Sequence, residues 1–217
     1  MGTKRELRRA AIARRKAVPA DERVAAGERV AGRAASLLDG LDAGSTVAAY
    51  VPMGSEIDVS PVLMHVLERG LRLLVPMLGT GMDVGWGELR TLDDLCMAGD
   101  GRGRPEEPVH AETLGMEALR DAALVLVPAL AVDARGMRLG RGGGWYDRAL
   151  EHRAPGAPVV AVCWPWEVLG PGDGLLPREP HDLPVDGVLT PDGLTMFARP
   201  YRGRHAFGDG GTCRGDD

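Results

Sequence analysis

Several residue types are scarce in this chain of 217 residues, and each scarcity excludes a class of protein. The three cysteines, Cys96, Cys163 and Cys213, are odd in number and far apart, which argues against a disulfide framework and a CxxC metal site. The longest uninterrupted apolar run, residues 122–132, is too short to span a bilayer. The basic opening segment lacks the apolar stretch of a secretory signal. We therefore expect a reduced, cytoplasmic protein without a membrane partner.

Positive charge is also unevenly distributed. The formal net charge is −5, which argues against broad nucleic-acid binding. Yet the only lysines, Lys4 and Lys16, both lie in the first segment, with five arginines at positions 5, 8, 9, 14 and 15 between them. Such a run is usually a solvated helix face. The alternative is a local site for an anion.

The hydrophobic pattern predicts alternating strands and helices. Helices are expected over 3–18, 21–38, 60–70, 114–122 and 145–153. Asp21 is expected to cap the second helix, which runs to about Leu38 and has Val24, Val30 and Leu37 on its apolar side. Ser60 is the expected N-cap of the third helix. Strands are expected over 46–52, 71–78, near Trp86 within a long loop at 79–112, and over 123–132, 157–164, 185–193 and 194–200.

Near-continuous apolar strands that alternate with helices indicate one mostly parallel sheet with both faces covered. In such sheets, ligands bind beyond the carboxyl ends of the strands. We expect a single domain over 1–201, followed by a disordered tail over 202–217.

The segment RLGRGGGWYDRAL, residues 138–150, follows the most apolar predicted strand. A Rossmann loop would need glycine or alanine where Trp145 stands, and a Walker A loop would need a lysine. Bare glycine backbone can bring N–H groups close to a ligand, and Arg138 and Arg141 add charge suited to phosphate. Asp147 fits such a site if Mg²⁺ bridges it to the phosphate. Glycine content by itself is equally consistent with a plain connector between a strand and a helix. The arginines and Asp147 favour a phosphate-binding site.

The longer segment VPALAVDARGMRLGRGGGWYDRAL, residues 127–150, resembles the signature of the 5-formyltetrahydrofolate cyclo-ligase (5,10-methenyltetrahydrofolate synthetase) family. Three further blocks resemble the family in the same order along the chain: KRELR at 4–8, YVPMGSEIDV at 50–59 and PHDLPVDGVLTPDG at 180–193. The resemblance implies an α/β fold: a single-domain three-layer sandwich with a mostly parallel sheet flanked by helices, of the NagB/RpiA/CoA-transferase-like type.

The resemblance also implies a reaction. The family uses ATP and Mg²⁺ to close 5-formyltetrahydrofolate into 5,10-methenyltetrahydrofolate, through a phosphorylated formyl group, with release of ADP and phosphate. The implied partners are these two small molecules, and we expect a monomer. The alternatives are a non-catalytic relative that binds folate or nucleotide, and a related enzyme whose loop at 79–112 selects another substrate.

Roles carry over to this sequence by position. The implied ATP contacts are Lys4, Arg5, Arg8, Arg138, Leu139, Gly140, Arg141, Gly142, Gly143, Gly144, Trp145 and Tyr146, with Arg141 as the catalytic residue that stabilises the transferring phosphate. The implied folate contacts are Val51, Met53, Glu56, Trp145 and Tyr146, and the implied Mg²⁺ ligands are Asp147 and Asp186. Trp86 is a further candidate for the folate pocket, and His181 and Asp182 are candidates to support Asp186.

Each role competes with a simpler one. Val51 is also suited to core packing, Asp147 to the first turn of a helix, and Asp186 to an ordinary turn. The chain also departs from the family pattern. Gly143 stands where many members carry lysine, Trp145 where tyrosine is common, and Val59 where threonine is common. The missing lysine leaves Arg141 as the main side-chain charge expected at the γ-phosphate.

Overall fold

A computed structural model describes residues 2–78, 84–97, 104–170 and 172–197. Its helices are α1 (Lys4–Lys16), α2 (Ala20–Leu38), α3 (Ser60–Glu68) and α4 (Trp145–Leu150), with 3₁₀ helices η1 (Leu92–Asp94), η2 (Met116–Asp121) and η3 (Pro165–Glu167). Its strands are β1 (Thr46–Ala48), β2 (Arg72–Met77), β3 (Gly85–Leu89), β4 (Leu95–Met97), β5 (Glu106–Pro108), β6 (Ala122–Pro128), β7 (Ala131–Val132), β8 (Arg138–Leu139), β9 (Val159–Val162), β10 (Gly187–Thr190) and β11 (Gly193–Met196). The expected tail over 202–217 lies outside the described residues.

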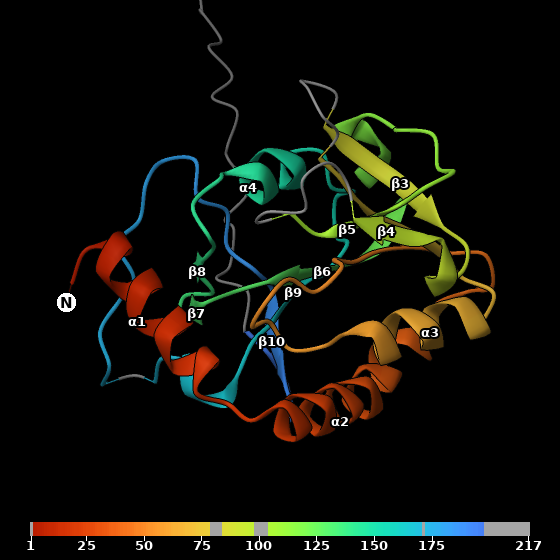
Figure 1. Ribbon diagram of the computed structural model, residues 1–217. Helices are drawn as coiled ribbons and strands as arrows, with labels where there is room; N and C mark the ends of the chain where they lie inside the picture. Colours follow the sequence, from red (N-terminus) through yellow and green to blue (C-terminus); the bar gives the residue numbers. More distant parts are fainter. Residues whose placement is uncertain (1, 79–83, 98–103, 171, 198–217) are drawn as a thin grey trace, which may run out of the picture.

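One seven-stranded sheet organises the chain, in the order β11-β10-β9-β6-β1-β2-β3 (Figure 1). The five central strands are parallel, and the two edge strands, β3 and β11, pair antiparallel with their neighbours. This confirms the expected mostly parallel α/β sheet. Two short hairpins, β4-β5 and β7-β8, lie outside it.

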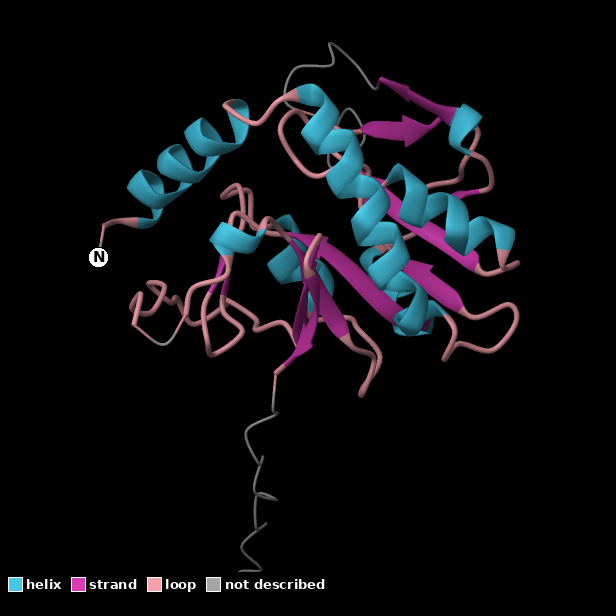
Figure 2. Cartoon of the chain, turned by 90° about the horizontal axis from the view of Figure 1, so that it is seen from below, coloured by secondary structure: helices cyan, strands magenta, loops and turns pink. Residues whose placement is uncertain are grey.

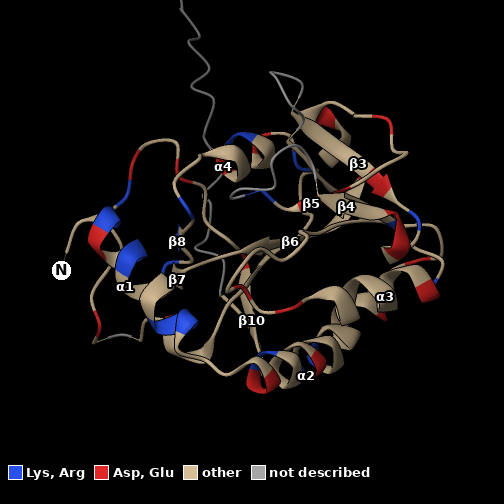
Figure 3. Cartoon of the chain, in the orientation of Figure 1, with Lys and Arg blue, Asp and Glu red and all other residues tan. Residues whose placement is uncertain are grey.

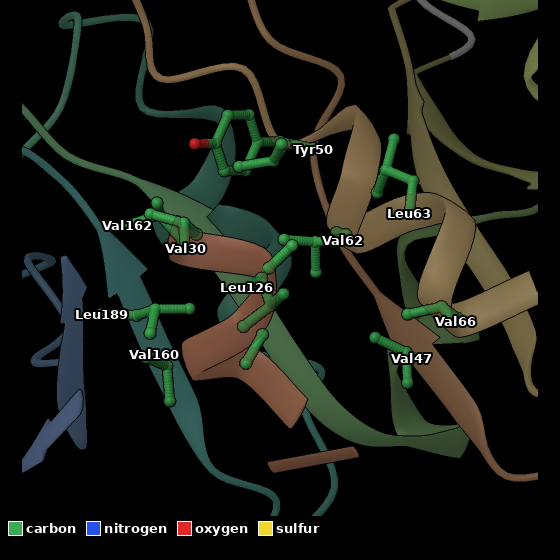
Figure 4. Close-up of a cluster of buried hydrophobic side chains, with 14 of the residues drawn as sticks. Val30, Val47, Tyr50, Val62, Leu63, Val66, Leu126, Val160, Val162 and Leu189 are labelled. Atoms are coloured by element: carbon green, nitrogen blue, oxygen red, sulfur yellow. The ribbon is translucent and has the colours of Figure 1, made fainter. Parts of the chain in front are cut away.

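Successive residues of the central strands face opposite sides of the sheet, because side chains alternate along a strand. Val47, Leu126 and Val160 face the cluster formed with α2 and α3, whereas Ala48 and Val127 face the cluster formed with α4 and η2. Figure 2 shows α2 and α3 lying over one face, and Figure 4 shows side chains of the first cluster. Both faces are therefore covered, as the apolar strands predict.

Helix α1 lies beside this sandwich rather than on either face of the sheet (Figures 1 and 2). It begins with a capping box between Thr3 and Glu6. Leu7, Ala11 and Ile12 pack against a third apolar cluster formed by the β7-β8 hairpin and its neighbours. The hairpin follows β6 directly, so α1 is held near the carboxyl edge of the sheet.

Details of two predicted helices differ from expectation. Asp21 lies within the first turn of α2, after Pro19 as N-cap, and makes no cap hydrogen bond. Val24, expected on the apolar side, is 58% exposed, because the buried stripe runs instead through Ala26 and Val30. Helix α3 has Val59 as its N-cap, one residue before Ser60, although the proline in its first turn is as predicted. The expected helix over 114–122 is the 3₁₀ helix η2.

Two predicted strands are shorter than their apolar runs. β1 ends at Ala48, although the chain stays buried through Val51. The run 123–132 contains β6, a break at Ala129 and Leu130, and then β7, which leaves the sheet to pair with β8. Within 79–112, β3 forms near Trp86 as predicted, and the β4-β5 hairpin was not anticipated. An apolar run predicts that a segment is buried, but it does not show where the hydrogen bonding between strands ends.

Candidate active site

A cavity of about 290 Å³ lies where β1 and β6 end and the glycine segment begins. Most of its walls come from four separate segments of the chain. Its lining residues are Lys4, Arg8, Tyr50, Val51, Met53, Glu56, Pro76, Leu78, Pro105, Pro128, Ala129, Leu130, Arg138, Leu139, Gly140, Arg141, Gly142, Gly143, Gly144, Trp145, Tyr146, Asp147, Glu179, His181 and Asp182. The site thus occupies the carboxyl edge of the parallel sheet, where ligands of α/β proteins bind.

The glycine segment forms one wall with little side-chain cover. Gly142 has φ +105°, and a Cβ there would lie 3.2 Å from Cζ of Arg8. Gly144 has φ +64° and directly precedes α4. Both positions need glycine, for conformation in each case and also for space at Gly142. A Cβ at Gly143 would meet nothing within 4 Å, so this position is open to the cavity.

Helix α1 contributes two basic side chains, Lys4 and Arg8, to the cavity wall. Nε of Arg8 donates to the carbonyl oxygen of Gly140 at 2.8 Å, which ties the helix to the glycine segment. Nζ of Lys4 lies 2.8 Å from Asp182 and 3.2 Å from Glu179. Figure 3 shows basic residues on α1. The spacing of four residues places both side chains on one helix face, as predicted.

The charges around Lys4 stabilise one another. Burial by itself lowers the pKa of Lys4, but its hydrogen bonds to Asp182 and Glu179 outweigh this and raise the pKa above its usual range. Burial raises the pKa of Asp182, and the hydrogen bond from Lys4 reverses the effect, so the net pKa is lowered. Lys4 is therefore held charged at the cavity. Oxygen and nitrogen atoms of Glu179, His181 and Asp182 also lie within 4.8 Å of one another.

Arg141 crosses the cavity from the glycine segment. Its Nε donates to Oε1 of Glu56 at 2.9 Å, and its Nη2 donates to the carbonyl oxygen of Met53 at 2.9 Å. Oε2 of Glu56 accepts from the backbone N–H of Met53 at 2.9 Å, which fixes the carboxylate in the turn at 53–56. The carboxylate is buried, with a side-chain exposure of 5%. The residue expected at the phosphate and the residue expected at the folate are thus in direct contact.

Arg138 and Asp147 form a second ion pair behind the glycine segment. Nη2 of Arg138 donates to Oδ1 of Asp147 at 2.8 Å, and the guanidinium lies over the ring of Tyr146, 5.7 Å from its centroid. The Arg138 side chain is 4% exposed, and its Nε has no hydrogen-bond partner among the described residues. Asp147 lines the cavity, so its carboxylate is available to a bound cation beside the glycine backbone. A carboxylate next to a phosphate loop is a donor that suits Mg²⁺.

Residues 1–191 match the 5-formyltetrahydrofolate cyclo-ligase family. The chain belongs to this family. A 5-formyltetrahydrofolate cyclo-ligase of Mycolicibacterium smegmatis is 42% identical over 196 residues, covering 87% of this chain and 94% of the relative. Membership makes this chain an enzyme of the ligase class.

Solved structures support the fold of the cyclo-ligase. The 5,10-methenyltetrahydrofolate synthetase of Aquifex aeolicus superposes with a TM-score of 0.73 at 28% identity, covering 94% of this chain and 98% of the other. That of Mycoplasma pneumoniae gives a TM-score of 0.64 at 17% identity, covering 87% and 98%, which shows a shared fold.

Most residues predicted for the cyclo-ligase site do meet in one cavity. These are Lys4, Arg8, Val51, Met53, Glu56, every residue from Arg138 to Tyr146, and Asp147. Arg5 is exposed and is not in the cavity wall. Trp86 is fully buried and packs edge-on against Trp145, with ring centroids 4.9 Å apart, so it supports the wall from behind.

Among the described helices, none is long and apolar enough to cross a membrane.

Asp186 is not brought to the cavity. Its carboxylate accepts from Nη1 of Arg153 at 3.0 Å and from the backbone N–H of Val159 at 2.9 Å. It directly precedes β10, at the amino end of a parallel strand, whereas the cavity lies at the carboxyl ends. His181 and Asp182, expected to support Asp186, instead line the cavity beside Lys4.

Two features of the site were not predicted from the sequence. Arg15, grouped with solvated arginines, is buried: its guanidinium makes two hydrogen bonds of 2.7 Å to Glu167 and a third to the carbonyl oxygen of Ala129. Its position offered a signal, since Arg15 follows Lys4 and Arg8 by eleven and seven residues and so shares their helix face. Tyr50, which falls within the predicted buried strand 46–52, also lines the cavity.

Proposed function

We propose that the chain uses ATP and Mg²⁺ to convert 5-formyltetrahydrofolate into 5,10-methenyltetrahydrofolate. The observation that carries the proposal is the contact between Arg141 and Glu56. It shows that the glycine segment, suited to phosphate, and the carboxylate suited to a pterin share one cavity. A phosphoryl donor and a formyl acceptor bound to these two parts would therefore lie next to each other, and catalysis by positioning needs that proximity.

The chemistry requires activation of the formyl oxygen, because this oxygen is otherwise a poor leaving group. In the first step the oxygen bonds to the γ-phosphorus of ATP while the bond from that phosphorus to ADP breaks. In the second step N10 bonds to the formyl carbon and loses its proton, and the carbon–oxygen bond breaks to release phosphate. Little covalent work falls to the protein, whose task is to orient the groups and stabilise charge.

Each protein group has a task in these steps. Backbone N–H groups of the glycine segment, together with Lys4 and Arg8, bind the phosphates. Arg141 leaves Glu56 and stabilises the charge on the transferring phosphoryl group, while Glu56 accepts hydrogen bonds from the amino group and ring N–H of the pterin.

The Asp147 carboxylate fits Mg²⁺ because it lies in the cavity wall beside the glycine segment. The ion would supply positive charge at the phosphates. Because Asp186 lies outside this wall, we assign the ion to Asp147 with donors from the phosphates and water. Asp186 as a second ligand stays a prediction that mutation can test.

The decisive experiment follows the product's near-ultraviolet absorbance. Purified protein is mixed with 5-formyltetrahydrofolate, ATP and Mg²⁺, and each component is omitted in turn. We expect the band only in the complete mixture, with ADP released in equal amount. Folate binding without product in the complete mixture would reject the reaction and favour a non-catalytic binding protein.

A further inference from the structure

Tyr50 combines burial with a place in the cavity wall. It follows β1 at the carboxyl edge of the sheet, lines the cavity and is only 2% exposed. Its ring belongs to the core cluster beneath α2 and α3. Figure 4 shows the ring at the edge of the cluster, with the hydroxyl oxygen pointing away from Leu63. The ring is therefore fixed by packing, and its hydroxyl has one defined position.

The hydroxyl of Tyr50 makes no hydrogen bond to a described residue, and its oxygen is not fully buried, so it is open to the cavity. A buried phenol usually finds a partner, because an unpaired polar group in the interior costs stability. Burial, reinforced by the negative charge of Glu56, raises the pKa of Tyr50 well above its usual range. The group therefore stays protonated and can donate a hydrogen bond.

The surroundings of this hydroxyl belong to the predicted folate side of the cavity. Tyr50, Glu56 and Tyr146 all line the cavity, and burial together with the negative charge of Glu56 raises the pKa of both phenols. Arg15 and Cys163 are the other titratable groups that act on Tyr50. Neither lines the cavity. The cavity thus presents a carboxylate acceptor, Glu56, and a phenol donor, Tyr50, which lie six residues apart on the same segment of its wall.

The edge of a pterin ring has the matching order of groups. Its 2-amino group and ring N3–H are neighbouring donors, and the 4-oxo oxygen beside them is an acceptor. A carboxylate that takes the two donors leaves the oxygen needing a donor next to that carboxylate. We propose that the Tyr50 hydroxyl donates a hydrogen bond to the 4-oxo oxygen of the pterin while Glu56 accepts from its two N–H groups. This inference rests on the proposed function, because it takes 5-formyltetrahydrofolate as the ligand.

Tyr50→Phe removes one oxygen and keeps the ring, which makes it a direct test. We expect the KM and the dissociation constant for 5-formyltetrahydrofolate to rise about 2- to 12-fold, the range for one neutral hydrogen bond. The KM for ATP should stay unchanged. The melting temperature should stay about equal, because the substitution keeps the packed ring and the hydroxyl bonds to no described residue. A residue that only supports the fold would show lower stability together with weaker binding.

Cys163→Ala provides the matched control. Cys163 is fully buried and does not line the cavity. This variant should lose thermal stability through the space it leaves, with both KM values unchanged. Unaltered folate binding in Tyr50→Phe, or equal changes in both KM values, would overturn the role of Tyr50 alone. Absence of turnover in the unmodified enzyme would instead reject the reaction, and the Tyr50 inference with it.

Discussion

At the scale of single residues, the site depends on carboxylates whose neighbours set their tasks. Asp147 faces the cavity and holds Arg138, so its oxygen atoms can meet a cation that also binds phosphate. Asp186 holds Arg153 and a backbone N–H near the opposite edge of the sheet. We therefore expect the Asp147 carboxylate to serve binding and the Asp186 carboxylate to serve structure.

A pair of amide substitutions separates these tasks. Asp147→Asn should lower kcat at least about 100-fold and weaken the response to Mg²⁺, because the transition state loses charge stabilisation. Asp186→Asn should keep the Mg²⁺ dependence and lose about 1–3 kcal/mol of unfolding free energy, as expected when a buried ionic hydrogen bond is weakened. Mg²⁺ titrations of activity and urea unfolding measure the two effects. A lost Mg²⁺ response in Asp186→Asn would make that residue a ligand after all.

At the scale of elements, the glycine segment owes its shape to particular positions. Gly142 and Gly144 have positive φ, and Gly142 lies against Arg8. Gly143 has no such constraint and faces open space in the cavity wall. The segment can therefore accept a side chain at one central position and not at its neighbour.

Gly143→Lys should lower the KM for ATP by about 3- to 10-fold, because an ammonium near the phosphates adds charge-assisted hydrogen bonds. Gly142→Lys is the control, since it adds the same charge where φ is +105° and Arg8 blocks the space. That variant should raise the KM for ATP. Steady-state kinetics with varied ATP gives both values, and equal effects of the two lysines would contradict the geometry.

The position of α1 depends on a buried ion pair. Arg15 and Glu167 each have a side-chain exposure of 2%, and Glu167 also accepts from the backbone N–H of Trp164. Burial lowers the pKa of Arg15, and the pairing with Glu167 raises it above its usual range. Burial raises the pKa of Glu167 overall, although Arg15 opposes the change. The pair fixes the end of the helix whose other end presents Lys4.

Arg15→Met should lower the unfolding free energy by about 3–5 kcal/mol, since it leaves Glu167 buried without a partner charge. Adding Glu167→Gln should recover part of the loss, because glutamine is neutral and still accepts from Trp164. Arg9→Gln, on the exposed side of the same helix, should change the unfolding free energy by less than about 0.5 kcal/mol. Urea unfolding tests the three variants. A small loss of unfolding free energy in Arg15→Met would show that the ion pair is weak.

At the scale of the whole molecule, the cavity exists only because distant segments meet at one edge of the sheet. Arg141 and Glu56 are 85 residues apart in sequence, and their contact lies between the proposed nucleotide and folate parts of the cavity. Each substrate has a reason to break this contact, because a phosphate attracts Arg141 and a pterin competes for Glu56. We therefore expect that binding of either substrate prepares the site for the other, and such coupling is reciprocal.

A nonhydrolysable ATP analogue with Mg²⁺ should tighten binding of 5-formyltetrahydrofolate by about 5-fold or more. Arg141→Gln should bind folate without nucleotide at least as tightly as the unmodified enzyme and show no such gain. Calorimetric titrations with and without the analogue measure both. Equal folate affinity in the two conditions for the unmodified enzyme would show that the contact does not couple the sites.

The sequence by itself determined the parts of the site that depend on local spacing. Lys4 and Arg8 share a helix face because they are four residues apart, and the glycines make a bare loop wherever the chain places them. Long apolar strands likewise determined a mostly parallel sheet with both faces covered, and so the edge at which a ligand binds.

Only the tertiary structure decided which side chains face one another. Arg15 pairs with Glu167, 152 residues away, and helix spacing shows the side of a helix without showing its partner. Asp147 lines the cavity at the carboxyl edge of the sheet, whereas Asp186 precedes β10 at its amino end, a distinction that neighbouring residues in the sequence do not reveal. Tyr50 belongs to both core and cavity, since its strand ends at the point where the sheet edge opens. Such contacts arise from chain topology, which brings distant groups into the same low-dielectric space.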